Sequence, residues 1–303
     1  MITDLRNLIA AEWLKLSRRP LSWVLLGVFL GLMLLYLATW ALVVMLHTGA
    51  LIGGNTRFEV LSPAQIVELQ RQLSVPGIFG AVLGQVNSTG GICAIILAAG
   101  FLGSDYTWGT LRVLLTRAPH RGAYLLAKLI TLQIGILVTI LIALLIGALF
   151  ALVCSSTLGI PSHLRPGDLL ALPVGVLRSL YIILPYVMLT LASAAFGRSA
   201  LAGVGGGLIF LALDVSAGSL NTIGVVSPLV RWLVNLLLQP NINTLVVLNS
   251  QLFGLDQSVL LSSLDLGLLP SPLHATLVIA AYSGFFFWGA YRLLLRRDVV
   301  GAY

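Results

Sequence analysis

The chain has 303 residues, a mean hydropathy of +1.03 and a formal net charge of +7. Hydrophobic residues make up 58% of it and charged residues only 9%, whereas about 25% of the residues in a typical soluble domain are charged. This composition excludes a cytosolic enzyme, a disordered chain and a secreted disulfide scaffold. It predicts an all-α integral membrane protein whose single domain covers residues 1–303.

The positive charge and the two cysteines have ordinary explanations in a membrane protein. Lysine and arginine gather in cytoplasmic loops, and the sequence has no basic patch with interleaved aromatic residues that would indicate a nucleic acid partner. Cys93 and Cys154 lie far apart in apolar runs, without the spacing of a zinc site. We therefore expect no nucleic acid binding, no metal site and no catalytic residues.

The first predicted element is an amphipathic helix over residues 3–18. Apolar residues from Leu5 to Leu16 recur at helical spacing, while basic residues lie elsewhere around the helix. Such a helix typically lies in the membrane interface with its apolar face toward the lipid.

Long stretches without charge predict six spanning helices after this first helix. A charged residue at the bilayer centre costs a few kcal/mol, so spans are expected between charges. Each span needs about 20 apolar residues. The predicted spans cover about residues 21–46, 76–102, 124–153, 177–197, 199–219 and 272–294.

Two segments outside these spans also carry helix signals. In the first outer loop, Ser62 followed by Pro63 predicts a helix start. The last outer loop, residues 220–271, contains the apolar pieces Val225–Leu238 and Leu245–Leu255, separated by a polar break at 239–243. Each piece is too short to cross about 30 Å of hydrocarbon, so we expect a re-entrant or interfacial hairpin and no seventh span.

The distribution of basic residues predicts the orientation of the chain. With six spans, 12 of the 17 Lys and Arg residues fall on the side of the two termini. Positive charge marks the cytoplasmic side of a membrane protein, so both termini are expected in the cytoplasm. The expected location is the plasma membrane, that is, the bacterial inner membrane.

The segment 103–121 joins the second and third predicted spans on that side. Ser104 or Asp105 is expected to begin a short helix, which Pro119 ends. A partner that grips this helix would move the two spans that it joins. The alternative is a basic loop that only sets the topology, and the residues leave both open.

Four polar residues lie in the middle of the second predicted span: Gln85, Asn87, Ser88 and Thr89. Polar side chains at this depth have to face other helices or a water-filled path. We expect them either to line a translocation path or to make interhelical hydrogen bonds.

The fifth predicted span holds two further features. Asp214 is the only acidic residue inside a predicted span, and it is expected to bind a cationic substrate or ion, to pair with Arg178 or Arg231, or to reach the outer interface. Gly203 and Gly207 form a G-x-x-x-G pattern, which predicts close helix packing within one chain or between two.

Three patterns together resemble the type-2 permeases of ABC transporters. They are Glu12-Trp13-x-Lys15-x-x-Arg18-Arg19-Pro20, then Asp105-x-x-x-Gly109-Thr110-x-Arg112-x-Leu114-Leu115 with Pro119-x-Arg121 and Lys128, and finally Gly197-Arg198-Ser199-Ala200. The resemblance covers the layout of the whole chain: an interfacial elbow helix at 3–18, six spans, a cytoplasmic coupling helix after the second span and a long outer loop before the last. One departure is Asp105, where the family more often has Glu.

The resemblance implies a dimeric permease driven by two cytoplasmic ATPase subunits, which bind ATP and Mg. It implies an ATPase-coupling role for Asp105, Trp108, Gly109, Thr110, Arg112, Arg117 and Arg121. Independently of the resemblance, the sequence contains no Gly-Lys dipeptide and therefore no G-x-x-x-x-G-K phosphate loop. We expect this chain to bind no cofactor of its own.

The predicted function is that of the permease subunit of an ABC exporter, which is not itself an enzyme and moves a lipophilic or amphipathic substrate outward. A secondary transporter or channel is one alternative, for which inverted repeats with discontinuous helices and a buried ionisable pair are expected. A membrane-embedded enzyme is another, but it needs catalytic groups within reach of one another. The four histidines all fall in loops or at span ends.

Overall fold

The computed structural model describes residues 2–48, 61–108, 121–218, 228–260 and 266–296. Within these ranges every regular element is a helix and no strand is present. Six of the helices are long and apolar enough to cross a membrane. The prediction of an all-α membrane protein with six candidate spans is therefore confirmed.

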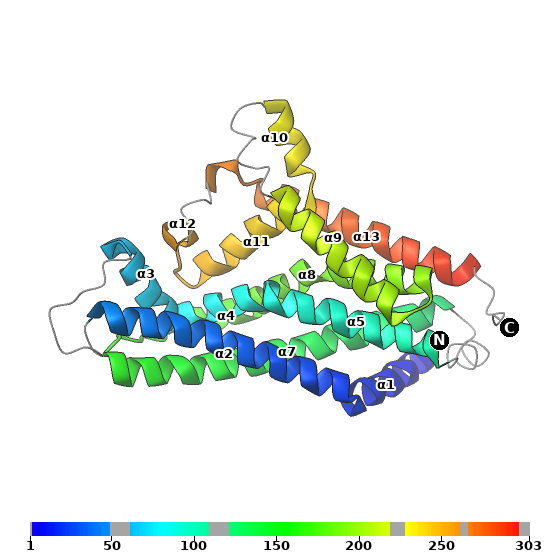
Figure 1. Ribbon diagram of the computed structural model, residues 1–303, viewed down its shortest axis with the longest axis horizontal. Coiled ribbons are helices and arrows are strands. Elements are labelled where there is room, and N and C mark those ends of the chain that lie inside the picture. Colours follow the sequence, from blue (N-terminus) through cyan, green and yellow to red (C-terminus); the bar gives the residue numbers. More distant parts are fainter. Residues whose placement is uncertain (1, 49–60, 109–120, 219–227, 261–265, 297–303) are drawn as a thin grey trace.

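Figure 1 shows how the helices are arranged. They are α1 (Ile2–Arg18), α2 (Pro20–Thr48), α3 (Pro63–Leu73), α4 (Gly77–Asn87), α5 (Thr89–Thr107), α7 (Arg121–Leu158), α8 (Pro166–Gly197), α9 (Ala200–Gly218), α10 (Pro228–Asn235), α11 (Leu238–Leu252), α12 (Gln257–Leu260), the 3-10 turn η2 (Leu266–Leu268) and α13 (Pro272–Arg296).

Helix α8 lies at the centre of the bundle. It packs against α13, α9 and α5, and also against α11 and α4, while α7 covers α4 and α1. The outside of the bundle is apolar: Leu35, Leu145 and Leu201 are all exposed. Contact with lipid in place of water removes the cost of exposing such side chains.

The second predicted span is a pair of helices and not the continuous helix expected over 76–102. Helix α4 ends at Asn87 and α5 begins at Thr89, with Ser88 between them at φ −90° and ψ −87°. The 11 residues of α4 extend only about 16 Å. The polar side chains around Ser88 explain the break, because their hydrogen bonds compete with the backbone hydrogen bonds of a continuous helix.

The break in the last outer segment also differs from the prediction. The chain is interrupted at Leu236 and Leu237, and the polar stretch 239–243 begins α11. Pro240 is tolerated there because the first-turn N–H groups of a helix have no partner within the helix. Asn241 Nδ2 donates to the carbonyl oxygens of Asn235 and Leu237, at 2.8 and 2.6 Å, which holds the turn together.

Helix α1 and the C-terminal end of α13 lie at the same end of the bundle (Figure 1). Lys128, near the start of α7, bonds to Glu12 of α1, and Gly122 of α7 lies beside Tyr291 of α13. This arrangement agrees with an even number of membrane crossings. That α1 is an elbow in the membrane interface stays a prediction.

Candidate functional site

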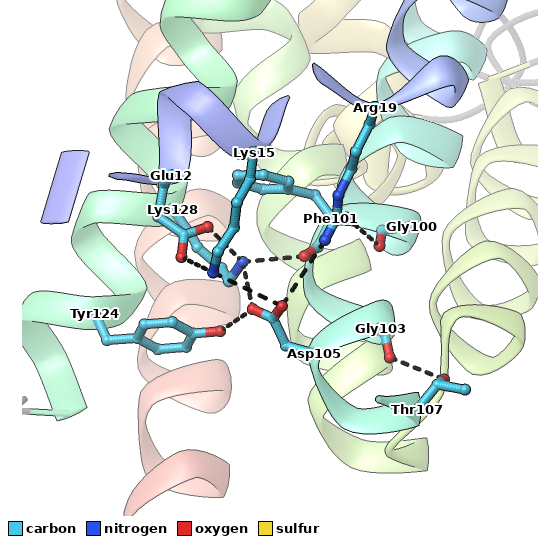
Figure 2. Close-up of polar contacts among 10 residues, drawn as sticks. All are labelled: Glu12, Lys15, Arg19, Gly100, Phe101, Gly103, Asp105, Thr107, Tyr124 and Lys128. Carbon is cyan, nitrogen blue, oxygen red and sulfur yellow. Dashed lines mark hydrogen bonds and ion pairs between the residues drawn. The ribbon is translucent and has the colours of Figure 1, made fainter. Parts of the chain in front are cut away.

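Charged side chains from three helices meet inside the bundle, at the end where α1 lies (Figure 2). We call this group the charge cluster; its members are Glu12, Lys15, Arg19, Asp105, Tyr124 and Lys128. Because α1, α5 and α7 each supply at least one member, the cluster joins these helices at one point.

Lys128 is the centre of the charge cluster. Its Nζ lies 2.8 Å from Glu12 Oε2 and 2.7 Å from Asp105 Oδ2, and it donates to the Phe101 carbonyl oxygen at 3.0 Å. The side chain is 0% exposed. A buried ammonium group with three acceptors uses all of its protons, which offsets the cost of removing it from water.

Asp105 is surrounded by donors and cations. The Tyr124 hydroxyl donates to Oδ2 at 2.5 Å. The other oxygen, Oδ1, lies 3.9 Å from Arg19 Nη2 and 4.0 Å from Lys15 Nζ. Lys15 also bonds to Glu12 at 2.7 Å, so the two carboxylates share their cations.

Aromatic rings lie close to two cations of the charge cluster. The Lys128 ammonium lies 4.0 Å from the centre of the Phe101 ring, and the Arg19 guanidinium lies 5.2 Å from that of Trp108. These are cation–π distances. Trp108 itself is 66% exposed, so it connects the buried charges to the molecular surface.

Helical spacing explains why each helix can supply its part. Glu12 and Lys15 are three residues apart, Phe101 and Asp105 are four apart, and so are Tyr124 and Lys128, so each pair shares one helix face. Pro20 at the first position of α2 stops α1 and leaves Arg19 at the joint.

The structure places the predicted coupling residues unequally. Asp105 lies in the last turns of α5, 1% exposed, and not at the start of a surface helix as predicted. Arg121 begins α7, but its side chain lies outside the described residues. Trp108 is the residue that caps the C-terminal end of α5, and its side chain is exposed. The other four predicted coupling residues, Gly109, Thr110, Arg112 and Arg117, lie outside the described residues.

The polar residues around Ser88 make interhelical hydrogen bonds. Asn87 Nδ2 donates to Ser179 Oγ at 3.4 Å, and Asn249 Nδ2 donates to the same oxygen at 3.0 Å. Thr89 Oγ1 donates to Gln85 Oε1 at 3.2 Å. The first group joins α4, α8 and α11, while Gln85 also lines a cavity between α2, α3, α4 and α11.

Asp214 has none of the ion pairs considered for it among the described residues. Its carboxylate accepts from the Tyr186 hydroxyl at 2.6 Å and from the Gln239 backbone N–H at 3.0 Å. Arg178 donates to Asn249, and Arg231 donates to the Gly267 carbonyl oxygen. Asp214 therefore ties α9 to the start of α11.

Gly203 and Gly207 lie where α9 contacts its neighbours. A Cβ added at Gly203 would lie 3.1 Å from Ala99 Cα, and one at Gly207 would lie 2.6 Å from Ile95 Cγ2. Both glycines thus permit close packing of α9 on α5 within one chain.

The described residues contain no group of three or more His, Cys, Asp or Glu side chains that could hold a metal ion. The groups of the charge cluster are paired with one another, and these pairs join α1, α5 and α7.

No protein-family model matches the sequence, and no curated protein is significantly similar to it.

Every member of the charge cluster except Tyr124 belongs to one of the sequence patterns described above. Those patterns do not indicate that the side chains meet. One signal was available. Lys128 falls inside the predicted span 124–153, and a lysine within a span requires partners in the protein.

Proposed function

We propose that this chain is the permease subunit of an ATP-driven exporter in the plasma membrane, with both termini in the cytoplasm. Two cytoplasmic ATPase subunits would bind ATP and Mg, and a second permease chain, identical or related, would complete the pathway. The cargo is a lipophilic or amphipathic molecule that leaves the cell.

The charge cluster is the observation that carries this proposal. It joins α5 to α7, the two helices connected by the segment 108–120, and ties both to α1. A pull on the connecting segment would reach a rigid joint instead of two independent helix ends, because breaking a buried ion pair costs several kcal/mol.

The geometry supports the following use of that joint. An ATPase subunit that closes on ATP moves the segment after Trp108. Because Lys128 binds both Glu12 and Asp105, α1, α5 and α7 move together. Motion of α5 is passed to α9 through the close contacts at Gly203 and Gly207, which opens the path outward.

A secondary transporter is the second candidate, and the interruption at Ser88 favours it. Discontinuous helices supply ion and substrate sites in such proteins. The charge cluster, however, lies at one end of the bundle (Figure 1, Figure 2), while transporter ion sites lie near the bilayer midplane.

Purification of the tagged full chain from its native membranes tests the proposal. We expect an ATPase to co-purify and to drive export in vesicles without an ion gradient. A Trp108→Ala variant of the chain should no longer stimulate the activity of the co-purified ATPase. Trp288→Ala is the matched control, since its exposed ring also contacts an arginine, at 5.3 Å from Arg292.

Transport that needs an ion gradient and proceeds without any ATPase would contradict the exporter and support the secondary transporter. Equal loss of ATPase stimulation in both tryptophan variants would show that the loss is not specific to Trp108. It would contradict a role of the charge cluster in coupling to the ATPase.

A further inference from the structure

A cavity of about 430 Å³ lies at the opposite end of the bundle from the charge cluster, between α2, α3, α4, α11 and α12 (Figure 1). Sites for small molecules commonly enclose about 300–1,000 Å³. The cavity is therefore large enough for one small ligand or for one end of a longer molecule.

The lining of this cavity includes several polar side chains but no charged one among the described residues. Its polar side chains are mostly amides, contributed by α3, α4, α11 and α12: Gln65, Gln72, Gln85, Asn243 and Gln257. No Asp, Glu, Lys, Arg or His is among the described residues that line it. A charged ligand would lose its hydration without gaining an opposite charge, which is costly.

One polar atom in the lining is buried without a partner. Gln72 is 6% exposed, and its Nε2 donates to the Tyr36 hydroxyl at 3.0 Å. Its Oε1 has no hydrogen-bond partner among the described residues. A buried acceptor left in this state destabilises a protein, so a turn of the Gln72 side chain toward a ligand O–H or N–H donor in the cavity would be favourable.

The rest of the lining is apolar. The Trp40 ring packs edge-on against Tyr36, with 6.1 Å between ring centres. Leu69 of α3 and Val247 of α11 also line the cavity. A ligand that hydrogen-bonds to the amides would therefore also contact aromatic and aliphatic surface in the cavity.

Helix α4 leaves space for the ligand. Gly84 is part of the lining, and a Cβ added there would meet no atom within 4 Å. A larger side chain at this position would enter the cavity without displacing the backbone of a neighbouring helix. Gly84 is thus a position at which the cavity is filled by one substitution.

We propose that this cavity binds the head of an uncharged amphiphile, with hydroxyl or amide groups on Gln72 and Gln85 and an apolar tail along Trp40 and Leu69. The identification of this ligand with the exported cargo rests on the proposed function. Its binding in the cavity does not depend on that function.

Photolabelling of the full-length chain in phosphatidylcholine nanodiscs tests the proposal. Three probes share one diazirine-bearing tail and differ in the head: a monoacylglycerol, a fatty acid anion and a trimethylammonium cation. We expect the monoacylglycerol to label residues 36–40, 61–85 and 238–257 preferentially. Gly84→Leu should abolish this labelling, while Gln72→Leu should weaken it about fivefold.

Two controls match these variants. Gly31→Leu adds the same side chain at an exposed glycine of α2 that is outside the cavity and also has no atom within 4 Å of its Cβ. Gln251→Leu removes an exposed amide of α11 that is not part of the lining. Both should be labelled like the wild type.

Equal labelling by all three probes, or labelling that Gly84→Leu leaves unchanged, would overturn the proposal. The two proposals fail separately. A chain that co-purifies with an active ATPase but takes no neutral probe is an exporter without this site. A chain whose cavity is labelled as expected but which transports without ATP keeps the site and loses the exporter role.

Discussion

Lys128 of α7 and Asp105 of α5 form an ion pair of 2.7 Å although neither side chain is more than 2% exposed. Glu12 of α1 binds the same ammonium group at 2.8 Å. Each charged group is therefore stabilised by the other two in place of water. The three helices to which they belong are fixed relative to one another.

Replacement of Lys128 by Met should strongly destabilise the protein. It leaves two buried carboxylates without their shared cation, which we expect to cost about 3–5 kcal/mol. The apparent unfolding temperature in detergent micelles measures the effect. Lys15→Met is the control, since Lys15 is 32% exposed and its loss should cost about 1 kcal/mol or less. Equal effects of the two variants would mean that burial does not set the strength of the cluster.

The pair Asp105 and Lys128 should behave as a coupled unit. In a double-mutant cycle with Asp105→Asn and Lys128→Met, we expect a coupling free energy of about 1–3 kcal/mol, because the two side chains share one network. The double variant should thus be more stable than the sum of the single effects predicts. Additive effects would argue against a direct contact between the two side chains.

Ser179 should stabilise the centre of the bundle through its two amide partners. Ser179→Ala leaves Asn87 and Asn249 without their common acceptor, and we expect a loss of about 1–2 kcal/mol in the free energy of unfolding. Ser156→Ala is the control: Ser156 is exposed and its hydroxyl bonds within its own helix to the Val153 carbonyl oxygen. A change as small as that of the control would mean that the hydrogen bonds of Asn87 and Asn249 to Ser179 add no stability.

Gly207 and Gly205 of α9 should respond differently to the same substitution. A Cβ at Gly207 would lie 2.5 Å from Thr190 Oγ1, whereas one at Gly205 would meet nothing within 4 Å. Gly207→Val should therefore destabilise the chain by about 1–3 kcal/mol, and Gly205→Val should leave the packing of α9 intact. Thermal unfolding of both variants measures the difference. Similar stability of the two would contradict the packing of α9 against α8.

Patterns along the chain were sufficient for features that depend on neighbouring residues. Ser62 and Pro63 predicted the start of α3, and the structure confirms it: Ser62 Oγ accepts from the Gln65 backbone N–H at 3.3 Å. The break at Ser88 was harder to predict. A polar stretch in an apolar run is compatible both with a continuous helix and with two helices, and the partners that decide between them, such as Ser179 and Asn249, lie far along the chain.

Composition along the chain is sufficient to predict a helical membrane protein with six long apolar helices, because the transfer of each segment into lipid depends on its own residues. The positions at which those helices break, and the charges that meet, follow from the folded structure. Lys128 bonds to Glu12, which is 116 residues away, and Gln72 bonds to Tyr36 across two helices. Such contacts depend on packing between helices, and no local pattern encodes which helix face will meet which.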